Sequence, residues 1–164
     1  MHKIKIRKAT ETDIGTVLGI SAACDLERWT ATDYREETRR PDSIFLVASI
    51  GVRTTGFISG RQVPASSSES LEAEIYNIGV RPDFQGKGVG DALLQAFFVE
   101  CREMRIRSVW LDVRTTNGRA IAFYVRNGFE KVATRACFYN DPQCDALVMR
   151  CRISSSRESV KTAN

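Results

Sequence analysis

The chain has 164 residues, of which 43% are hydrophobic and 27% charged, and this composition indicates a globular domain of ordinary size. Its only histidine is His2, next to Met1, so a Ser-His-Asp or Cys-His site and a histidine-ligated zinc are not expected. Acid–base chemistry must then come from carboxylates, tyrosine, cysteine or lysine. The net charge of +4 suits an anionic ligand such as a phosphate-bearing cofactor, yet it is too small to indicate nucleic-acid binding.

Cysteine usage and the apolar runs bear on the cellular compartment. The five cysteines are odd in number and include no CxxC pair, so neither a disulfide framework nor a zinc ribbon is expected. Reduced thiols are typical of a cytosol. The longest nearly unbroken apolar run, residues 44–52, is about half of what a membrane span requires. We therefore expect a cytoplasmic protein with no metal site and no membrane segment.

Apolar periodicity and turn residues define the elements of the first half. Alternation of apolar and basic residues marks a strand, and a hydroxyl followed three residues later by an acid marks a helix start. A proline ends a helix, and two apolar runs around a short turn form a hairpin. The expected elements are a strand around residues 4–6, a helix beginning near residue 10, a helix from Thr32 to just before Pro41, antiparallel strands at 44–50 and 56–63, and a surface loop at 64–70.

The second half continues the alternation of strands and helices. We expect strands at 74–80, 108–113, 131–137 and 146–153, with helices at 88–104 and 117–126. The last residues are polar and carry no apolar period. The sequence therefore predicts a mixed α/β fold, with residues 1–153 forming a single domain and residues 154–164 a flexible polar tail.

A glycine-rich turn stands between the predicted strand 74–80 and the long helix. Glycines let the backbone approach a ligand closely, and a helix N-terminus offers unpaired N–H donors, so such a turn suits a pyrophosphate. A Walker loop would need Ser or Thr after the lysine, and a Rossmann turn a third glycine where Asp91 stands. An ordinary strand–helix connection remains the alternative. The turn consists of Gln85, Gly86, Lys87, Gly88, Val89 and Gly90.

This turn resembles the Q/R-x-x-G-x-G/A motif of the GNAT N-acetyltransferase superfamily, which binds acetyl-CoA. Residues 72–80 look like the fourth strand of that family, and the pattern N-x-x-A-I-x-x-Y-x-x-x-G-F at 117–129 resembles its second major motif. Within the superfamily the chain is most similar to the RimI-type ribosomal-protein-alanine N-acetyltransferases. The supporting segments are W-T-x-x-x-Y at 29–34, W-L-D-V-R at 110–114, F-Y at 138–139 and D-A at 145–146, and the resemblance covers residues 3–153.

The resemblance implies a GNAT-like fold, with a central, mostly antiparallel twisted sheet of about six to seven strands flanked by about four helices. It implies transfer of acetyl from acetyl-CoA to the α-amino group of a polypeptide N-terminus, such as that of a ribosomal protein. It also implies a monomer or weak homodimer with no direct nucleic-acid or membrane partner. The backbones of Ile78 and Val80 would contact the pantetheine arm, residues 85–90 the pyrophosphate, and Asn117 the cofactor through a hydrogen bond, although an asparagine there also serves as a helix N-cap.

The reaction needs a base, because the attacking amine must lose a proton. An α-amino group has a pKa near 8, against roughly 10.4 for lysine, so a carboxylate acting directly or through water suffices. By resemblance the base is a glutamate at the position of Asp112, and the shorter aspartate favours relay through a water. Glu74 is the second candidate, since other branches of the superfamily place a catalytic glutamate at this point. Either acid could instead be a surface or ion-paired group.

The leaving thiolate needs a proton donor, and Tyr124 resembles the general acid of the family. Its alternative role is a half-buried aromatic on its helix. For the acceptor site the resemblance points to Trp29, Tyr34 and Tyr139, together with Arg28, although Trp29 and Tyr34 would also serve to pack the first two helices. The cysteines at 101 and 151 fall on apolar faces, so we expect direct attack in a ternary complex rather than an acetyl-cysteine route.

Two other functions remain open from the sequence. A GNAT domain could acetylate a small-molecule amine or a lysine side chain instead of an N-terminus. A non-catalytic acyl-CoA sensor is the other alternative, favoured by the shortened acid at 112 and opposed by the intact tyrosine at 124.

Overall fold

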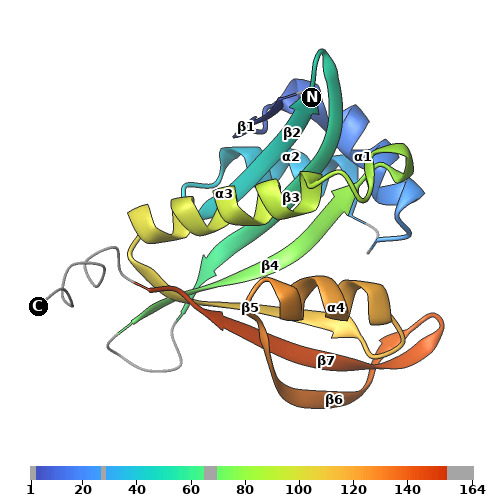
Figure 1. Ribbon diagram of the computed structural model, residues 1–164, viewed down its shortest axis with the longest axis vertical. Coiled ribbons are helices and arrows are strands. Elements are labelled where there is room, and N and C mark those ends of the chain that lie inside the picture. The colour runs from blue at the N-terminus through green and yellow to red at the C-terminus, as the bar shows by residue number, and fades with distance from the viewer. Residues whose placement is uncertain (1–2, 27–28, 65–69, 155–164) are drawn as a thin grey trace, which may run out of the picture. The chain divides into compact units, whose positions relative to one another are not determined.

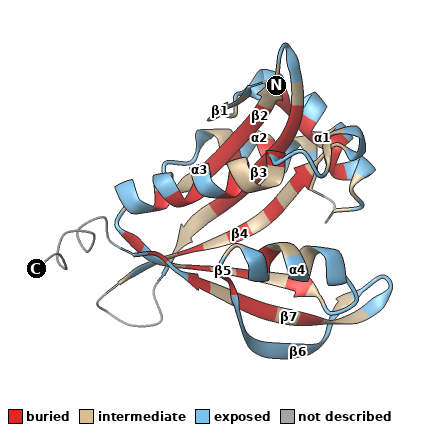
Figure 2. Cartoon of the chain, in the orientation of Figure 1, coloured by how far each residue is buried: buried red, intermediate tan, exposed pale blue. Residues whose placement is uncertain are grey.

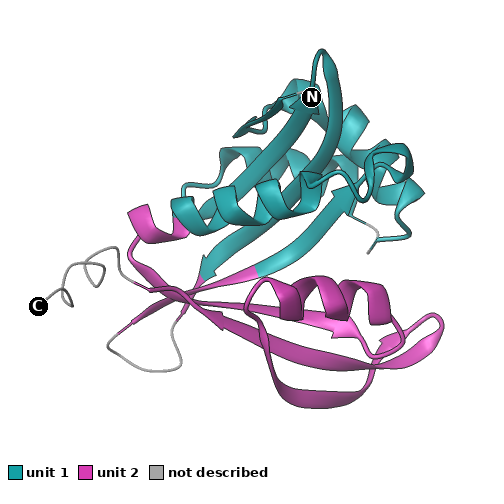
Figure 3. Cartoon of the chain, viewed as in Figure 1, with its two compact units in different colours: residues 1–62, 75–100 teal, residues 63–74, 101–164 magenta. Residues whose placement is uncertain are grey.

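The computed structural model describes residues 3–26, 29–64 and 70–154, and the chain divides into two compact units (Figure 3). The first unit comprises residues 1–62 and 75–100, and the second comprises residues 63–74 and 101–164. The single domain expected over residues 1–153 stays a prediction. His2, most of the expected loop at 64–70 and nearly all of the expected tail lie outside the described residues.

The strands follow the order β1-β2-β3-β4-β5-β7-β6 in a seven-stranded sheet (Figure 1). The pairs β1–β2, β2–β3, β5–β7 and β6–β7 are antiparallel, whereas β4 and β5 are parallel. The mixed α/β, mostly antiparallel architecture predicted from the sequence is therefore confirmed. The strands are β1 Ile4–Lys8, β2 Ser43–Ile50, β3 Arg53–Val63, β4 Leu71–Val80, β5 Ile106–Arg114, β6 Glu130–Asn140 and β7 Gln143–Arg152.

The described residues form four α-helices, close to the predicted positions. The second begins at Ala31, one residue earlier than expected, because Thr30 caps it. The Thr30 hydroxyl accepts from the Asp33 N–H at 3.2 Å, and the Asp33 carboxylate accepts from the Thr30 N–H at 2.6 Å. The helices are α1 Ile14–Ala23, α2 Ala31–Arg39, α3 Val89–Glu103 and α4 Gly118–Arg126, with 3₁₀ turns η1 Glu11–Asp13 and η2 Pro82–Phe84.

In the first unit, helices cover both faces of the sheet. Alternation along β3 places Phe57 against α1 and α2, and it turns Gly56 toward α3, where an added Cβ would meet Leu93 and Val89. Burial of these apolar side chains is the main stabilising contribution of the unit. The cluster on the α1 and α2 side consists of Ile14, Val17, Ile20, Tyr34, Phe45, Val47 and Phe57.

In the second unit, the two faces of β5 differ in character. Val109, Leu111 and Val113 are buried, while the residues between them are half-buried. Cys151 pairs with Val109 across the sheet, and its sulfur lies 4.0 Å from the carbonyl oxygen of Asn127 at the end of α4. Helix α4 therefore covers the apolar face of β5. Strand β6, at the edge of the sheet, is exposed along most of its length (Figure 2).

Among the residues that the structure describes, no helix combines the length and the apolar character needed to cross a membrane.

Candidate active site

Asp112 lies on the face of β5 that α4 does not cover, as the sequence alternation predicts. Its side chain is only 14% exposed, and its Oδ1 atom is buried without a hydrogen-bond partner in the structure. Arg135 Nε, from β6, lies 3.8 Å from this oxygen, which is too long for a hydrogen bond. Burial raises the pKa of Asp112 above its ordinary value, and the charge of Arg135 opposes the shift. The carboxylate thus keeps a free lone pair and has a raised basicity.

Glu74, the second candidate, belongs to the same unit and lies near Asp112. Its backbone pairs with that of Trp110 across the parallel β4–β5 ladder. Burial raises the pKa of Glu74, repulsion from Asp112 raises it further, and Arg135 lowers it. The two candidates from the sequence therefore form one electrostatically coupled group, in which ionisation of either acid disfavours ionisation of the other.

Tyr124 is brought to the opposite side of β5, because α4 carries it. The residue is 7% exposed, and the centroid of its ring lies 5.3 Å from that of Phe123 and 5.4 Å from that of Phe129. Burial raises the pKa of the phenol, with a further contribution from Tyr139. The hydroxyl is therefore protonated at neutral pH and able to donate.

Asn117 caps α4. Its Oδ1 accepts a hydrogen bond from the Ala120 N–H at 3.1 Å, so the structural role that the sequence allowed is present. A hydrogen bond from Asn117 to a cofactor stays a prediction. The amide N–H₂ group of the side chain would be its donor.

The glycine-rich turn has the backbone that its sequence demands. Gly86 has φ +74° and Gly88 has φ +80°, both in the left-handed region, and no atom lies within 4 Å of a Cβ added at either position. Gln85 Nε2 donates to the carbonyl oxygen of Val80 at 2.9 Å, which ties the turn to the end of β4. Lys87 Nζ donates to the Asp83 carbonyl at 2.9 Å, so its charge stays beside the turn. The turn leads into α3, a helix of 15 residues.

The three acceptor candidates differ in accessibility. Tyr34 is fully buried in the core of the first unit, which is the packing role that the sequence left open. Trp29 is half-buried, and its ring centroid lies 5.2 Å from that of Tyr34 and 5.6 Å from that of Tyr76. Tyr139 is half-buried beside Arg114, whose guanidinium carbon lies 4.2 Å from its ring centroid. Arg28 lies outside the described residues.

Sequence reasoning missed three charged or reactive groups. Arg135 was hidden because two register shifts in the β6–β7 pair, between Lys131 and Ala133 and between Arg135 and Tyr139, set which face of the sheet each side chain of β6 takes. Arg61 on β3 forms an ion pair with the fully buried Glu37 on α2, a contact between distant segments. Cys144 has a pKa lowered to about 7, because the hydroxyls of Thr115 and Thr116 lie 3.4 and 3.6 Å from its sulfur. No local pattern in the sequence signals these contacts.

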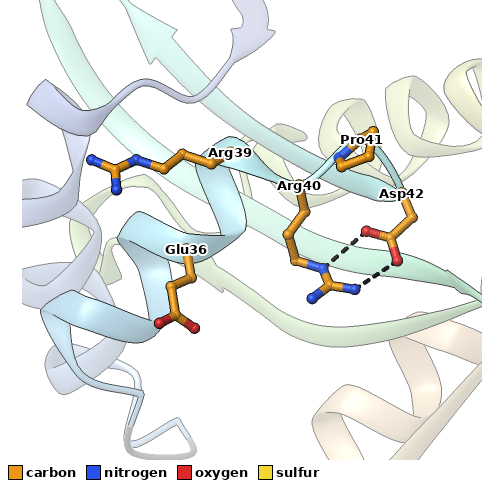
Figure 4. Close-up of a pocket in the computed structure, with 5 residues that line it drawn as sticks. All are labelled: Glu36, Arg39, Arg40, Pro41 and Asp42. Carbon is orange, nitrogen blue, oxygen red and sulfur yellow. Dashed lines mark hydrogen bonds and ion pairs between the residues drawn. The ribbon is translucent and has the colours of Figure 1, made fainter.

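A surface cavity of about 590 Å³ lies in the first unit at the end of α2 (Figure 4). Arg40 donates to both oxygens of Asp42 at 2.9 and 2.8 Å, and Arg39 points away and pairs with Glu11. None of its five lining residues is a candidate site residue, so we assign it no role in the chemistry. Within the described parts of the chain, no three His, Cys, Asp or Glu side chains gather as metal ligands.

The first unit thus carries a glycine-rich turn at a helix start, and the second unit carries a buried carboxylate and a buried tyrosine. The family model of the acetyltransferase (GNAT) family matches residues 15–129, more than half of the chain. The chain therefore belongs to the GNAT family, as its motifs indicated.

Several relatives of known name are similar to the chain. It is 39% identical over 85 residues to the ribosomal protein bS18-alanine N-acetyltransferase of Escherichia coli K12, a match covering 51% of this chain and 57% of that protein. The match thus spans little more than half the length of this relative. The chain is 32% identical over 126 residues to the N-alpha-acetyltransferase RimI of Mycobacterium tuberculosis, covering 74% of each.

Solved structures support the same fold. The structure of Ard1 from Thermoplasma volcanium superposes with a TM-score of 0.83 at 32% identity, covering 93% of this chain and 99% of that chain. The ribosomal-protein-S18-alanine N-acetyltransferase from Escherichia coli gives a TM-score of 0.79 at 25% identity, covering 98% and 100%.

Proposed function

We propose that this chain is an acetyl-CoA-dependent N-acetyltransferase that acetylates the α-amino group of a polypeptide N-terminus by direct attack. The observation that carries the proposal is Asp112, a buried carboxylate with an unbonded oxygen and a raised pKa. Such a group is suited to accept a proton from an amine of moderate pKa. The relatives named as N-terminal acetyltransferases support the choice of acceptor.

The two faces of β5 separate the base from the acid. Asp112 lies on one face, and α4, which carries Tyr124, covers the other. A planar acyl group is attacked from one side, so a base on the side of the amine and a proton donor on the side of the leaving sulfur match the reaction. Asp112 accepts the proton of the amine, through a water where the short side chain does not reach it. Tyr124 donates its phenol proton to the departing thiolate.

The glycine turn fits the pyrophosphate of acetyl-CoA, which would supply the activated thioester when bound. Positive φ angles at Gly86 and Gly88 and the open space around both glycines let backbone N–H groups approach a phosphate closely. The first N–H groups of α3 have no partners within the helix and point toward its N-terminus. The residues of this chain therefore hold the cofactor mainly through the backbone, and Gln85 fixes the turn.

The acceptor is tested by measuring CoA-thiol release with peptides beginning with Ala, Ser, Met or Gly, alongside spermidine and free lysine. The proposal expects turnover with at least one peptide, blocked when its N-terminus is already acetylated. Turnover with the small amines alone would instead assign a small-molecule acetyltransferase. Tight acetyl-CoA binding without any turnover would indicate a sensor.

Replacing Gly88 by alanine is expected to weaken acetyl-CoA binding about tenfold. A residue with a Cβ in the left-handed region costs about 1–2 kcal/mol, and the turn would relax away from φ +80°. Calorimetric titration with CoA measures the loss. Gly15→Ala in α1 is the matched control, because it lies in a helix with free space around it and should leave CoA affinity unchanged. Equal affinities in the two variants would show that the turn does not need its positive φ.

Cys144 tests the direct-attack mechanism, since a pKa of about 7 would allow a covalent acetyl-cysteine. We expect Cys144→Ser to retain kcat within about twofold, and initial-rate plots against both substrates to intersect. Parallel plots, or a labelled acetyl group retained on the protein without acceptor, would require the covalent route instead.

Arg135 should set the acid limb of the pH–rate profile. Its charge lowers the pKa of both Asp112 and Glu74, so Arg135→Gln is expected to move that limb to higher pH. Arg135→Lys keeps the charge, so the acid limb should stay close to its wild-type position. Arg107→Gln removes the same charge from the opposite face of β5 and should leave the limb in place. A limb unmoved by Arg135→Gln would exclude both acids as the titrating base.

A further inference from the structure

In the first unit, an ion pair with a fully buried carboxylate contacts two aromatic rings. Glu37 on α2 has a side chain with no exposure to solvent, and Arg61 on β3 pairs with it. Arg61 Nε donates to both carboxylate oxygens, at 3.0 Å and 2.8 Å, and Nη2 donates to one of them. The fork of the guanidinium is therefore fixed in one orientation. This hydrogen bonding raises the pKa of Arg61, so its charge is permanent.

The same guanidinium contacts both aromatic rings. Its carbon lies 5.9 Å from the ring centroid of Trp29 and 5.4 Å from that of Tyr76, and the two rings lie 5.6 Å apart. Both distances are within the range of cation–π attraction. Trp29 comes from the connection between α1 and α2, whereas Tyr76 is two residues beyond Glu74 along β4. One locked cation thus joins a connecting segment to the strand that carries a candidate catalytic acid.

Stability alone does not account for this pair. Taking the Glu37 carboxylate out of water is costly, and well-packed apolar residues often stabilise such a position as well or better. The Arg40–Asp42 pair of the same unit shows the contrast, because it is a similar fork on the surface, and its guanidinium lies over no aromatic ring of the described residues. What distinguishes the Glu37–Arg61 pair is the placement of Trp29 and Tyr76.

We infer that Arg61, held by Glu37, is a positioning residue that fixes Trp29 and Tyr76 as the aromatic wall against which the first residues of the acceptor peptide lie. This inference rests on the proposed function. Aromatic rings provide a large contact area at low entropic cost, and a wall fixed before binding avoids the cost of ordering it. An extended peptide N-terminus with a small first side chain is the chemistry that such a wall fits.

The test combines steady-state kinetics with tryptophan fluorescence. Arg61→Gln is expected to raise KM for the peptide about tenfold, with KM for acetyl-CoA within twofold of wild type. Arg61→Lys keeps the charge but loses the fork of the guanidinium. Its KM for the peptide should therefore lie between the values for the wild type and Arg61→Gln. In a Trp110→Phe background Trp29 is the sole tryptophan, and Arg61→Gln should red-shift its emission and increase its quenching by acrylamide. Arg39→Gln, which removes an exposed arginine that pairs with Glu11, is the control and should change neither quantity.

A merely structural role would give a different pattern. It would lower kcat through loss of active protein, or raise both KM values together, and either result overturns the inference. Arg61→Gln leaves a buried carboxylate unpaired and could unfold the chain. The double variant Glu37→Gln with Arg61→Gln removes both charges and must show the same increase in peptide KM.

Failure of the proposed function is distinguishable from failure of this inference. If no peptide is acetylated by the wild-type protein, the proposed acceptor is wrong, yet the Trp29 emission still reports whether Arg61 fixes the ring. If peptides are acetylated and Arg61→Gln changes neither peptide KM nor Trp29 emission, the inference is wrong and the function stands.

Discussion

Asp112→Asn is expected to lower kcat/KM for a peptide acceptor about 100- to 1,000-fold, the usual effect of removing a general base. The asparagine side chain has nearly the same shape but cannot accept the proton of the amine. KM for acetyl-CoA should change little, because the proposed function assigns cofactor binding to the backbone of the glycine turn. Steady-state rates of CoA-thiol release against peptide concentration measure the loss.

The same variant should be more stable than the wild type at neutral pH. Burial raises the pKa of Asp112 in the folded chain, so the ionised carboxylate costs folding free energy at every pH above that raised value. Below about pH 3.9, the ordinary value for aspartate, the acid is protonated in both folded and unfolded states, and this cost disappears. Thermal unfolding of Asp112→Asn should therefore show a higher Tm at neutral pH, with a difference that shrinks on acidification. A gain in stability with a loss of activity would identify a residue retained for chemistry.

Glu74→Gln separates the two coupled acids. Because ionised Glu74 and Asp112 repel each other, removing the charge of Glu74 should lower the pKa of Asp112 and extend activity to lower pH, with only a modest change in the maximal rate. An Asp112→Asn variant with an unchanged pH–rate profile, beside an inactive Glu74→Gln variant, would transfer the base function to Glu74. An unchanged profile in both would exclude a carboxylate base from this unit.

Local patterns were sufficient for the fold and for part of the site. Alternation along 106–114 correctly places Asp112 opposite Val109, Leu111 and Val113, because the period of a strand does not depend on its neighbours. The glycine run predicts a turn with positive φ, because only glycine adopts it without strain. The predicted start of α2 was one residue late, because Thr30, which has an acid three residues later, caps the helix.

Contacts between distant segments could not be predicted in the same way. The approach of Arg135 to Asp112 depends on the pairing of β6 with β7 and on the bulge after Arg135. The pairing of Glu37 with Arg61 depends on how α2 packs, and a charged residue on an amphipathic helix is by default expected on its solvated face. Each of these groups modifies a neighbour that the sequence did identify. Tertiary structure therefore sets the environment of the candidate site residues, which local sequence patterns do not reveal.

Tyr124→Phe is expected to lower kcat about 100-fold while leaving KM for acetyl-CoA and for the peptide nearly unchanged. The substitution removes one hydroxyl from a ring packed between Phe123 and Phe129, so the aromatic packing and the fold should survive. Burial raises the pKa of this phenol, and it is therefore fully protonated throughout the neutral range. Its role as acid then adds no basic limb to the pH–rate profile at neutral pH.

The leaving group provides the sharper measurement. When an acyl donor with a more acidic thiol replaces acetyl-CoA, the departing thiolate needs less protonation, so the deficit of Tyr124→Phe should shrink. The deficit of Asp112→Asn should persist, since deprotonation of the amine does not depend on the thiol. Equal deficits with both donors would mean that Tyr124 supports the packing of α4 and that the thiolate takes its proton from solvent. A selective rescue would assign protonation of the leaving thiolate to Tyr124 and deprotonation of the amine to Asp112.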